Sequence, residues 1–114
     1  MNNCIFCKIA AGIIPANFLY NDEQLMAFHD LNPQAPVHVL IIPREHIATL
    51  NDLTFTHEAL IGKMILVARQ IADKAGISKR GYRTVFNCNA EAGQSVFHVH
   101  LHLLGGRPMN WPPG

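Results

Sequence analysis

The stretch Phe97–Leu104 reads FHVHLHLL and places three histidines at every second position. Along a β-strand, residues i, i+2 and i+4 share one face, so His98, His100 and His102 would point one way and the aliphatic residues between them the other. In a helix the same histidines would spread around the axis. The pattern therefore predicts a strand over 97–104, with one face on the core and an imidazole face against something polar.

Four interpretations of the imidazole face are open. A solvated strand surface would more usually carry Thr, Lys or Glu than three histidines. One metal held by all three is disfavoured, because the outer Cα atoms of such a strand lie about 13 Å apart and metal–nitrogen bonds are only about 2 Å long. A pH-sensing cluster would need a switching element. The fourth interpretation is anion chemistry.

In the anion interpretation, a neutral imidazole attacks a phosphorus atom while a protonated neighbour stabilises the phosphate. Upstream, the stretch Ala92–Ser95 adds a flexible turn with amide and hydroxyl donors, and Asn87 can reach the same edge from the preceding strand. This interpretation accounts for the most residues.

Length and composition restrict the class of protein. A chain of 114 residues with 49% hydrophobic residues suits one domain, 1–114, with its own core. Nine basic and eight acidic residues are scattered, which favours a small ligand over nucleic acid. No apolar run is long enough to cross a membrane. An odd cysteine count and a start without signal-peptide character predict a cytoplasmic protein with reduced thiols.

The surest element is a helix over 56–75, with Thr56 as N-cap and Gly76 as the C′ residue. Apolar, β-branched and turn residues predict the rest: a short helix over 4–11, a hairpin of strands 17–20 and 25–30, a loop over 32–36, strands over 38–43 and 82–88, and an extended tail over 105–114. Strands on both sides of one long helix predict an α+β domain with a mostly antiparallel sheet.

Several stretches besides the triad resemble one known family. They are Cys4–Ile9, Ala27–Pro36, His38–Pro43, Gly93–Phe97 and Gly105–Gly114, together with His98–Leu104. The last matches the histidine–hydrophobic alternation of the histidine triad (HIT) family. The full set, which covers essentially the whole chain, resembles the nucleotide-binding phosphoramidase branch of that family.

The resemblance implies a homodimer in which two five-stranded sheets join into one. It further implies purine nucleoside monophosphates as ligands, hydrolysis of nucleoside phosphoramidates, and no cofactor for catalysis. Two rivals remain at this point: a nucleotide-binding regulatory module that acts through protein partners, and a dinucleoside polyphosphate hydrolase. The tail Trp111–Gly114 favours the phosphoramidase branch.

By position, the resemblance makes His100 the nucleophile, His102 a phosphate ligand and His38 a residue that helps set the state of the nucleophile. The other implied roles are phosphate and leaving-group contacts for Asn87, Gly93, Gln94 and Ser95, with Ser95 near the departing nitrogen; a ribose contact for Asp30; base-pocket walls for Ile5, Phe6, Phe28, Leu31 and Leu40; and an approach of Trp111 to the partner's site. Asp30, Asn87, His38 and Trp111 each also have an ordinary structural explanation as turn, cap, satisfied histidine or hydrophobic plug.

Cys4 and Cys7 form a C-x-x-C pair, which is a weak metal signal alone. His46 and His98 are candidate partners. The resemblance supports a structural zinc, because some bacterial members of the family hold one on such a pair and two such histidines. The alternative is that both cysteines are ordinary buried thiols and His46 a helix-entry residue. Cys88 has no evident partner and is expected in the core.

Overall fold

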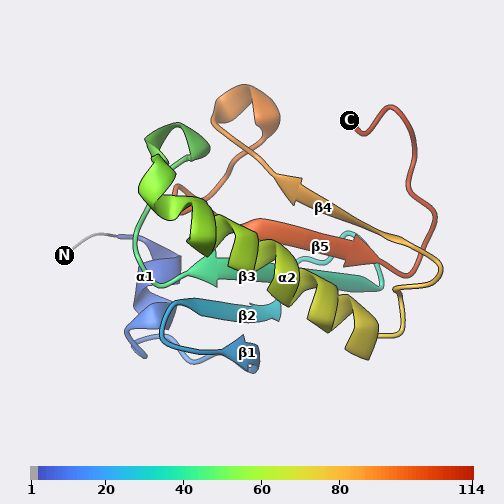
Figure 1. The fold of residues 1–114 in the computed structure, drawn as a ribbon, viewed down its shortest axis with the longest axis horizontal. Coiled ribbons are helices and arrows are strands. Elements are labelled where there is room, and N and C mark those ends of the chain that lie inside the picture. Colours follow the sequence, from blue (N-terminus) through green and yellow to red (C-terminus); the bar gives the residue numbers. More distant parts are fainter. Residues whose placement is uncertain (1–2) are drawn as a thin grey trace.

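The computed structural model describes residues 3–114, so the first two residues of the predicted 1–114 domain lie outside it. The described chain forms one sheet in the order β1-β2-β3-β5-β4, and every neighbouring pair is antiparallel (Figure 1). The strands are β1 Phe18–Asn21, β2 Leu25–His29, β3 Val37–Pro43, β4 Tyr82–Phe86 and β5 Leu101–Gly105, and the helices are α1 Ile5–Ala10 and α2 Glu58–Lys74. The predicted α+β class, with five antiparallel strands and one long helix, is confirmed.

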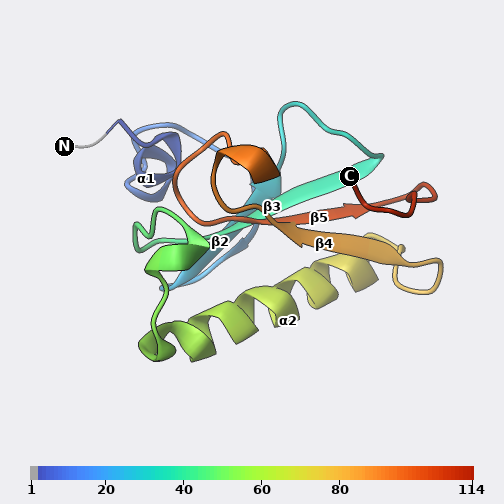
Figure 2. The same ribbon diagram turned by 90° about the horizontal axis from the view of Figure 1, so that it is seen from above.

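The central strand β3 divides the molecule into two cores. Val39 and Ile41 pack with the buried face of α2, whereas Leu40 and Ile42 pack with α1 on the other side of the sheet. This alternation follows from the period of two along a strand. Figure 2 shows the consequence, with the two helices on opposite sides of the sheet. The predicted hairpin, the strand 38–43 and the helix 4–11 are confirmed to within one or two residues.

Helix α2 ends as the sequence predicts and begins differently. Gly76 has a positive φ of 76°, and the amide of Ile77 donates to the carbonyl of Ala72, which caps the C-terminus. At the other end, the prediction of Thr56 as N-cap is wrong. A short 3-10 turn, η2 Phe55–His57, precedes α2, and the backbone amide of Thr54 donates to Nδ1 of His57. This capping box starts the helical turn two residues earlier.

The last strand is shorter than predicted. Only residues 101–105 pair in β5, so His98 and His100 precede the strand. The antiparallel register with β3 sets Ile41 opposite Leu101, and two residues further on it would pair Val99 with Pro43, which has no N–H to donate. The amide of Val99 instead donates to the carbonyl of Ile47 at 2.7 Å.

The predicted separation of faces nevertheless holds across this boundary. Val99, Leu101 and Leu103 are buried in the core beneath α2. The rings of His100 and His102 lie 4.9 Å apart between centroids, and both side chains line a cleft together with residues of α1. The hydrophobic face therefore packs on α2, as expected, and the histidines are left for the other side.

The segments beyond β4 and β5 differ slightly from expectation. Strand β4 ends at Phe86, so Asn87 and Cys88 follow it, and Cys88 is half-buried rather than in the core. Gly105 belongs to β5, and the tail from 106 onwards has neither helix nor strand. A guanidinium N–H of Arg83 donates to the Asn110 carbonyl at 2.8 Å and fastens the tail to β4. Within residues 3–114, no helix is long and apolar enough to cross a bilayer.

Candidate active site and metal centre

A cleft of about 220 Å³ opens on the α1 side of the sheet. It is lined by residues of α1, of strands β2, β3 and β5, and of the loop before β5. Its lining includes the five predicted base-wall residues, the predicted ribose ligand and three of the predicted catalytic residues: Ile5, Phe6, Phe28, Leu31 and Leu40; Asp30; and Ser95, His100 and His102. The geometry thus brings together residues from positions 5 to 102.

Sequence reasoning missed three residues that line the same cleft. They are Ile9, His29 and Val96. Ile9 lies four residues after Ile5 on a helix, and such residues share a face, so the helical spacing could have identified it. His29 is the last residue of β2, and no local pattern marks it as part of the cleft.

Phe6 connects the apolar end of the cleft with the histidines. Its ring packs edge-on against Phe28, with 5.9 Å between centroids, and against His100 at 5.2 Å. It also lies 5.8 Å from the ring of His98. Because Phe6 is buried, it excludes water from one side of the His100 imidazole while it forms a wall for a planar ligand.

The protonation pattern of His100 follows from its backbone contact. Its Nδ1 lies 2.7 Å from the carbonyl oxygen of His98. A carbonyl oxygen only accepts hydrogen bonds, so Nδ1 carries the proton. In the neutral side chain, Nε2 then holds an unshared electron pair. His100 lines the cleft, and this nitrogen is therefore suited to attack an electrophile bound there.

A second chain of hydrogen bonds fixes His102. The backbone amide of Gln34 donates to Nδ1 of His38 at 3.0 Å, so that Nδ1 is unprotonated and the proton of a neutral His38 resides on Nε2. That N–H lies 2.9 Å from Nδ1 of His102, which accepts it. His102 then carries its own proton on Nε2. The sequence predicts that His38 helps set the state of the nucleophile, and the direct contact that the structure gives His38 is with His102.

Burial determines the charge of His102. Desolvation, reinforced by the neighbouring imidazoles of His100 and His38, lowers the pKa of His102 to about 4. The His102 side chain is therefore neutral at pH 7, whereas the anion interpretation of the sequence used a protonated imidazole beside the nucleophile. A neutral His102 still offers an Nε2–H donor to a phosphate oxygen. A bound anion would raise its pKa again.

Asp30 is the third side chain in the hydrogen-bonded group that contains His38 and His102. Its carboxylate lies 3.4 Å from Nε2 of His38. The side chains of Asp30, His38 and His102 are close enough together to share a metal ion. Nε2 of His38 carries the proton, however, because the amide of Gln34 occupies Nδ1, so this nitrogen has no free electron pair for a metal. The bonding favours a hydrogen-bonded relay over a metal site here.

In the loop between β4 and β5, Ser95 faces the cleft, whereas the side chain of Gln94 is hydrogen-bonded to the protein backbone. Ser95 is exposed and lines the cleft. Gln94 is buried, and its side-chain amide donates to the carbonyls of Ala48 and Val96 while its oxygen accepts from the amide of Asn89. The Gln94 side chain thus holds the loop in shape. Asn87 and Gly93, which were predicted to contact the ligand, are not among the residues that line the cleft.

Four side chains meet at the start of α1 in an arrangement that suits zinc. The Sγ atoms of Cys4 and Cys7 and the Nδ1 atoms of His46 and His98 all lie within 4.8 Å of one another. The separations are 3.3 Å for Cys4–His98 and 3.2 Å for both Cys7–His46 and His46–His98. Tetrahedral zinc with two thiolates and two imidazoles requires ligand separations of about 3.3–3.8 Å.

The orientation of His98 also fits a metal. Its Nε2 lies 2.7 Å from the carbonyl oxygen of Pro43, and so carries the proton. Nδ1 therefore presents its electron pair to the two sulfur atoms and to His46. Metal-binding histidines commonly donate their second nitrogen to a carbonyl in this way. The residues present fit a zinc ion, and all four ligand positions would come from the protein.

The comparisons with known proteins agree with this geometry. The sequence pattern of the HIT domain family matches residues 11–109. The purine nucleoside phosphoramidase of Escherichia coli K12 is 50% identical over 105 residues, which are 92% of this chain and 88% of that one. In structure, a HIT family hydrolase from Legionella pneumophila superposes with a TM-score of 0.96 at 53% identity, covering 98% of this chain and all of the other.

A histidine triad nucleotide-binding protein from Candida albicans has the same fold at greater distance. Its TM-score is 0.81 at 31% identity, over 98% of this chain and 85% of that one. Together with the family match, these similarities show that the chain belongs to the HIT family. It is a hydrolase of that family.

Proposed function

We propose that this chain is a purine nucleoside phosphoramidase, which hydrolyses the P–N bond of nucleoside 5′-phosphoramidates such as adenosine 5′-monophosphoramidate. The similarity to the Escherichia coli purine nucleoside phosphoramidase supports the reaction class. The apolar walls of the cleft and the carboxylate of Asp30 support a nucleoside as ligand, because a carboxylate is a natural acceptor for ribose hydroxyls. The cytoplasmic location expected from the cysteine content stays a prediction.

The observation that carries the proposal is the hydrogen bond from Nδ1 of His100 to the carbonyl of His98. It leaves Nε2 as a free nucleophile in the cleft. Beside it, His102 supplies an N–H donor that His38 orients. A nucleophile and a phosphate donor on adjacent positions of the same face are what covalent catalysis at phosphorus requires.

The proposed reaction has two steps. Nε2 of His100 attacks the α-phosphorus, the P–N bond breaks, and the departing amine takes up a proton from water beside the Ser95 hydroxyl. The hydroxide left by that proton transfer then attacks the phosphorus of the nucleotidyl-histidine, the bond to Nε2 breaks with its electron pair returning to the imidazole, and the nucleoside monophosphate is released. His102 stabilises the phosphate oxygens in both steps.

The test is a comparison of substrates. We expect hydrolysis of adenosine 5′-monophosphoramidate to be much faster than hydrolysis of a diadenosine polyphosphate under the same conditions. Faster cleavage of the diadenosine compound would assign the chain to the dinucleoside polyphosphate hydrolases. Binding of a purine monophosphate without measurable turnover of either compound would support a regulatory module.

His38 offers a second test of the site. Replacement of His38 by alanine leaves Nδ1 of His102 without its donor, so that the Nε2–H of His102 is no longer enforced. Outright removal of a donor to the transition state costs about 10²–10³ in kcat. Here the donor is only no longer enforced, so kcat should fall by less, about tenfold to a hundredfold. Steady-state kinetics would measure this, and an unchanged kcat would contradict the relay from Gln34 through His38.

We also propose a homodimer, with α2 and β4 between the subunits. Strand β4 is at the edge of the sheet, and exposed edges are commonly paired or covered. On the outer face of α2, Ile65 and Leu66 remain 44% and 55% exposed, and Tyr82 of β4 is also exposed. Trp111, which is 83% exposed, would then be available to approach the partner's cleft.

Light scattering at micromolar concentration should therefore give about twice the monomer mass of 12.7 kDa. Replacement of Leu66 by arginine should shift the mass towards the monomer, because the charge would be buried between subunits. Ile13→Arg is the matched control, since Ile13 is also exposed but follows α1. A wild-type mass near 12.7 kDa would exclude the dimer.

A further inference from the structure

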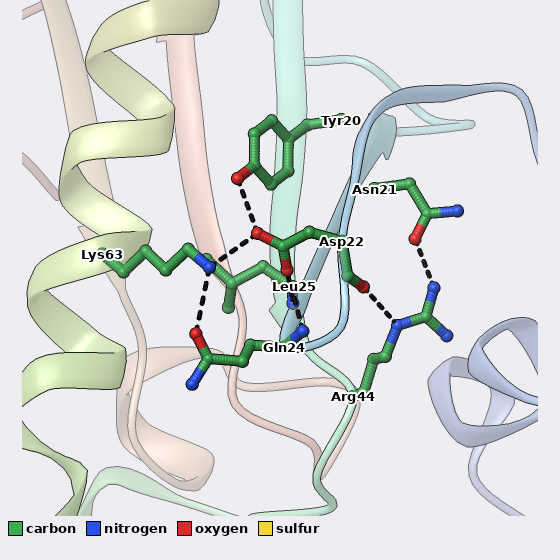
Figure 3. Close-up of polar contacts among 7 residues, drawn as sticks. All are labelled: Tyr20, Asn21, Asp22, Gln24, Leu25, Arg44 and Lys63. Carbon is green, nitrogen blue, oxygen red and sulfur yellow. Dashed lines mark hydrogen bonds and ion pairs between the residues drawn. The ribbon is translucent and has the colours of Figure 1, made fainter.

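Arg44 directly follows β3 and binds two segments that are distant in sequence. Its half-buried guanidinium donates from Nε to the carbonyl of Asp22 at 2.7 Å and from Nη2 to the side-chain oxygen of Asn21 (Figure 3). Its Nη1 donates to the carbonyl of Ala10 at 3.0 Å. One side chain thus joins the β1–β2 turn to the C-terminal residue of α1.

The contact with Ala10 matters because α1 is short. A helix of six residues is not stable alone in water, and the last carbonyls of any helix lack partners within it. Arginine side chains commonly bind such carbonyls. Arg44 therefore satisfies an end of α1 and, at the same time, fixes the distance between this helix and the sheet.

The position of α1 determines the shape of the cleft. Three of the lining residues, Ile5, Phe6 and Ile9, lie on this helix. Phe6 contacts both the opposite wall at Phe28 and the ring of His100. A movement of α1 away from the sheet would widen the base end of the cleft and expose one side of the nucleophile.

We propose that Arg44 is a positioning residue for the nucleotide cleft, which holds α1 at the distance from the sheet that a purine base requires. This inference rests on the proposed nucleotide-binding function. Arg44 lies outside the lining of the cleft, so its effect reaches the ligand through Phe6 and Ile9. It should act on binding more than on the chemical steps at His100.

The chain provides a matched control at the same turn. Lys63 of α2 donates to the carboxylate of Asp22 at 2.6 Å and to the side-chain oxygen of Gln24 at 3.0 Å (Figure 3). It reaches the turn from the other side of the sheet, and its hydrogen bonds go to the turn rather than to α1. Arg44→Met and Lys63→Met therefore both loosen the β1–β2 turn, but only the first releases the helix.

We expect Arg44→Met to raise the Kd of adenosine monophosphate and the KM for the phosphoramidate by about tenfold, with kcat within about threefold of wild type. Lys63→Met should leave Kd within about twofold. Arg44→Lys keeps one charged donor, and its Kd should lie between wild type and Arg44→Met. Calorimetry and steady-state kinetics measure these values, with the zinc content of each protein determined in parallel.

Hydrogen exchange provides a readout that needs no nucleotide. Lys8 lies in α1 and Ala11 directly follows it, and their backbone amides donate to the carbonyl oxygens of Cys4 and Cys7. These two amides should exchange faster in Arg44→Met than in Lys63→Met. If the wild-type protein binds no adenosine monophosphate, the proposed function is refuted. Hydrogen exchange would then still show whether Arg44 holds α1 in place. Equal exchange in both variants, or equal changes in Kd, would overturn the role of Arg44. If Arg44→Met does not fold, Arg44→Lys takes its place in both measurements.

Discussion

His100→Ala should lower the turnover of an adenosine phosphoramidate by several orders of magnitude. In the proposed mechanism Nε2 of His100 forms the bond to phosphorus, so the substitution removes the two-step route itself rather than weakening one contact. His98 lies outside β5, so its carbonyl takes no part in the strand pairing and accepts the hydrogen bond from Nδ1 of His100.

Binding of adenosine monophosphate should change much less in the same variant. The apolar walls and Asp30 supply most ground-state contacts, so the Kd should stay within about tenfold, which corresponds to about 1.4 kcal/mol. Turnover and calorimetric affinity are measured together on wild type, His100→Ala and the control His57→Ala. His57 is a histidine of the η2 turn before α2 and is not among the residues that line the cleft.

The pair of measurements separates chemistry from binding. His57→Ala should keep wild-type turnover and affinity. Near-normal turnover in His100→Ala would refute the covalent mechanism. A loss of affinity as large as the loss of turnover would show that His100 acts in ground-state binding, and would contradict its assignment as a nucleophile.

Elements with a strong local pattern were predictable from the sequence. Leu40 and Ile42 alternate with Val39 and Ile41 along β3, and the two sets enter different cores, as the period of two requires. Gly76 ends α2 because its positive φ suits a residue without Cβ. The base-wall residues were predicted through the family resemblance, and the cleft contains all of them.

Features that depend on distant partners were not predictable in the same way. The strand over 97–104 begins late because its neighbour ends in Pro43, which has no N–H for the ladder. Gln94 has its amide bound to the backbone of Ala48 and Val96, and no spacing in the sequence indicates this. The partner of His38 depends on the register that sets Leu40 opposite His102, which is a property of the folded sheet.

The four residues at the start of α1 provide the second large effect. We propose that Cys4, Cys7, His46 and His98 bind one zinc ion. Such a site has no open position for a substrate or water, so the metal would stabilise the fold and take no part in hydrolysis. Protein purified without added zinc or chelator should contain about one equivalent, as a site with four protein ligands requires.

Cys4→Ser should remove the zinc and lower Tm by about 10 °C or more. In a domain of this size each kcal/mol of stability shifts Tm by about 4 °C, and the loss of a structural zinc site costs several kcal/mol. Cys88→Ser is the matched control: Cys88 is likewise half-buried but lies outside the group of ligand atoms. It should keep both the metal and the melting temperature. Zinc-free wild type, with a Tm that Cys4→Ser does not change, would contradict the metal site. In that case the close approach of Cys7 to His46, at 3.2 Å, would be a hydrogen bond between ordinary side chains.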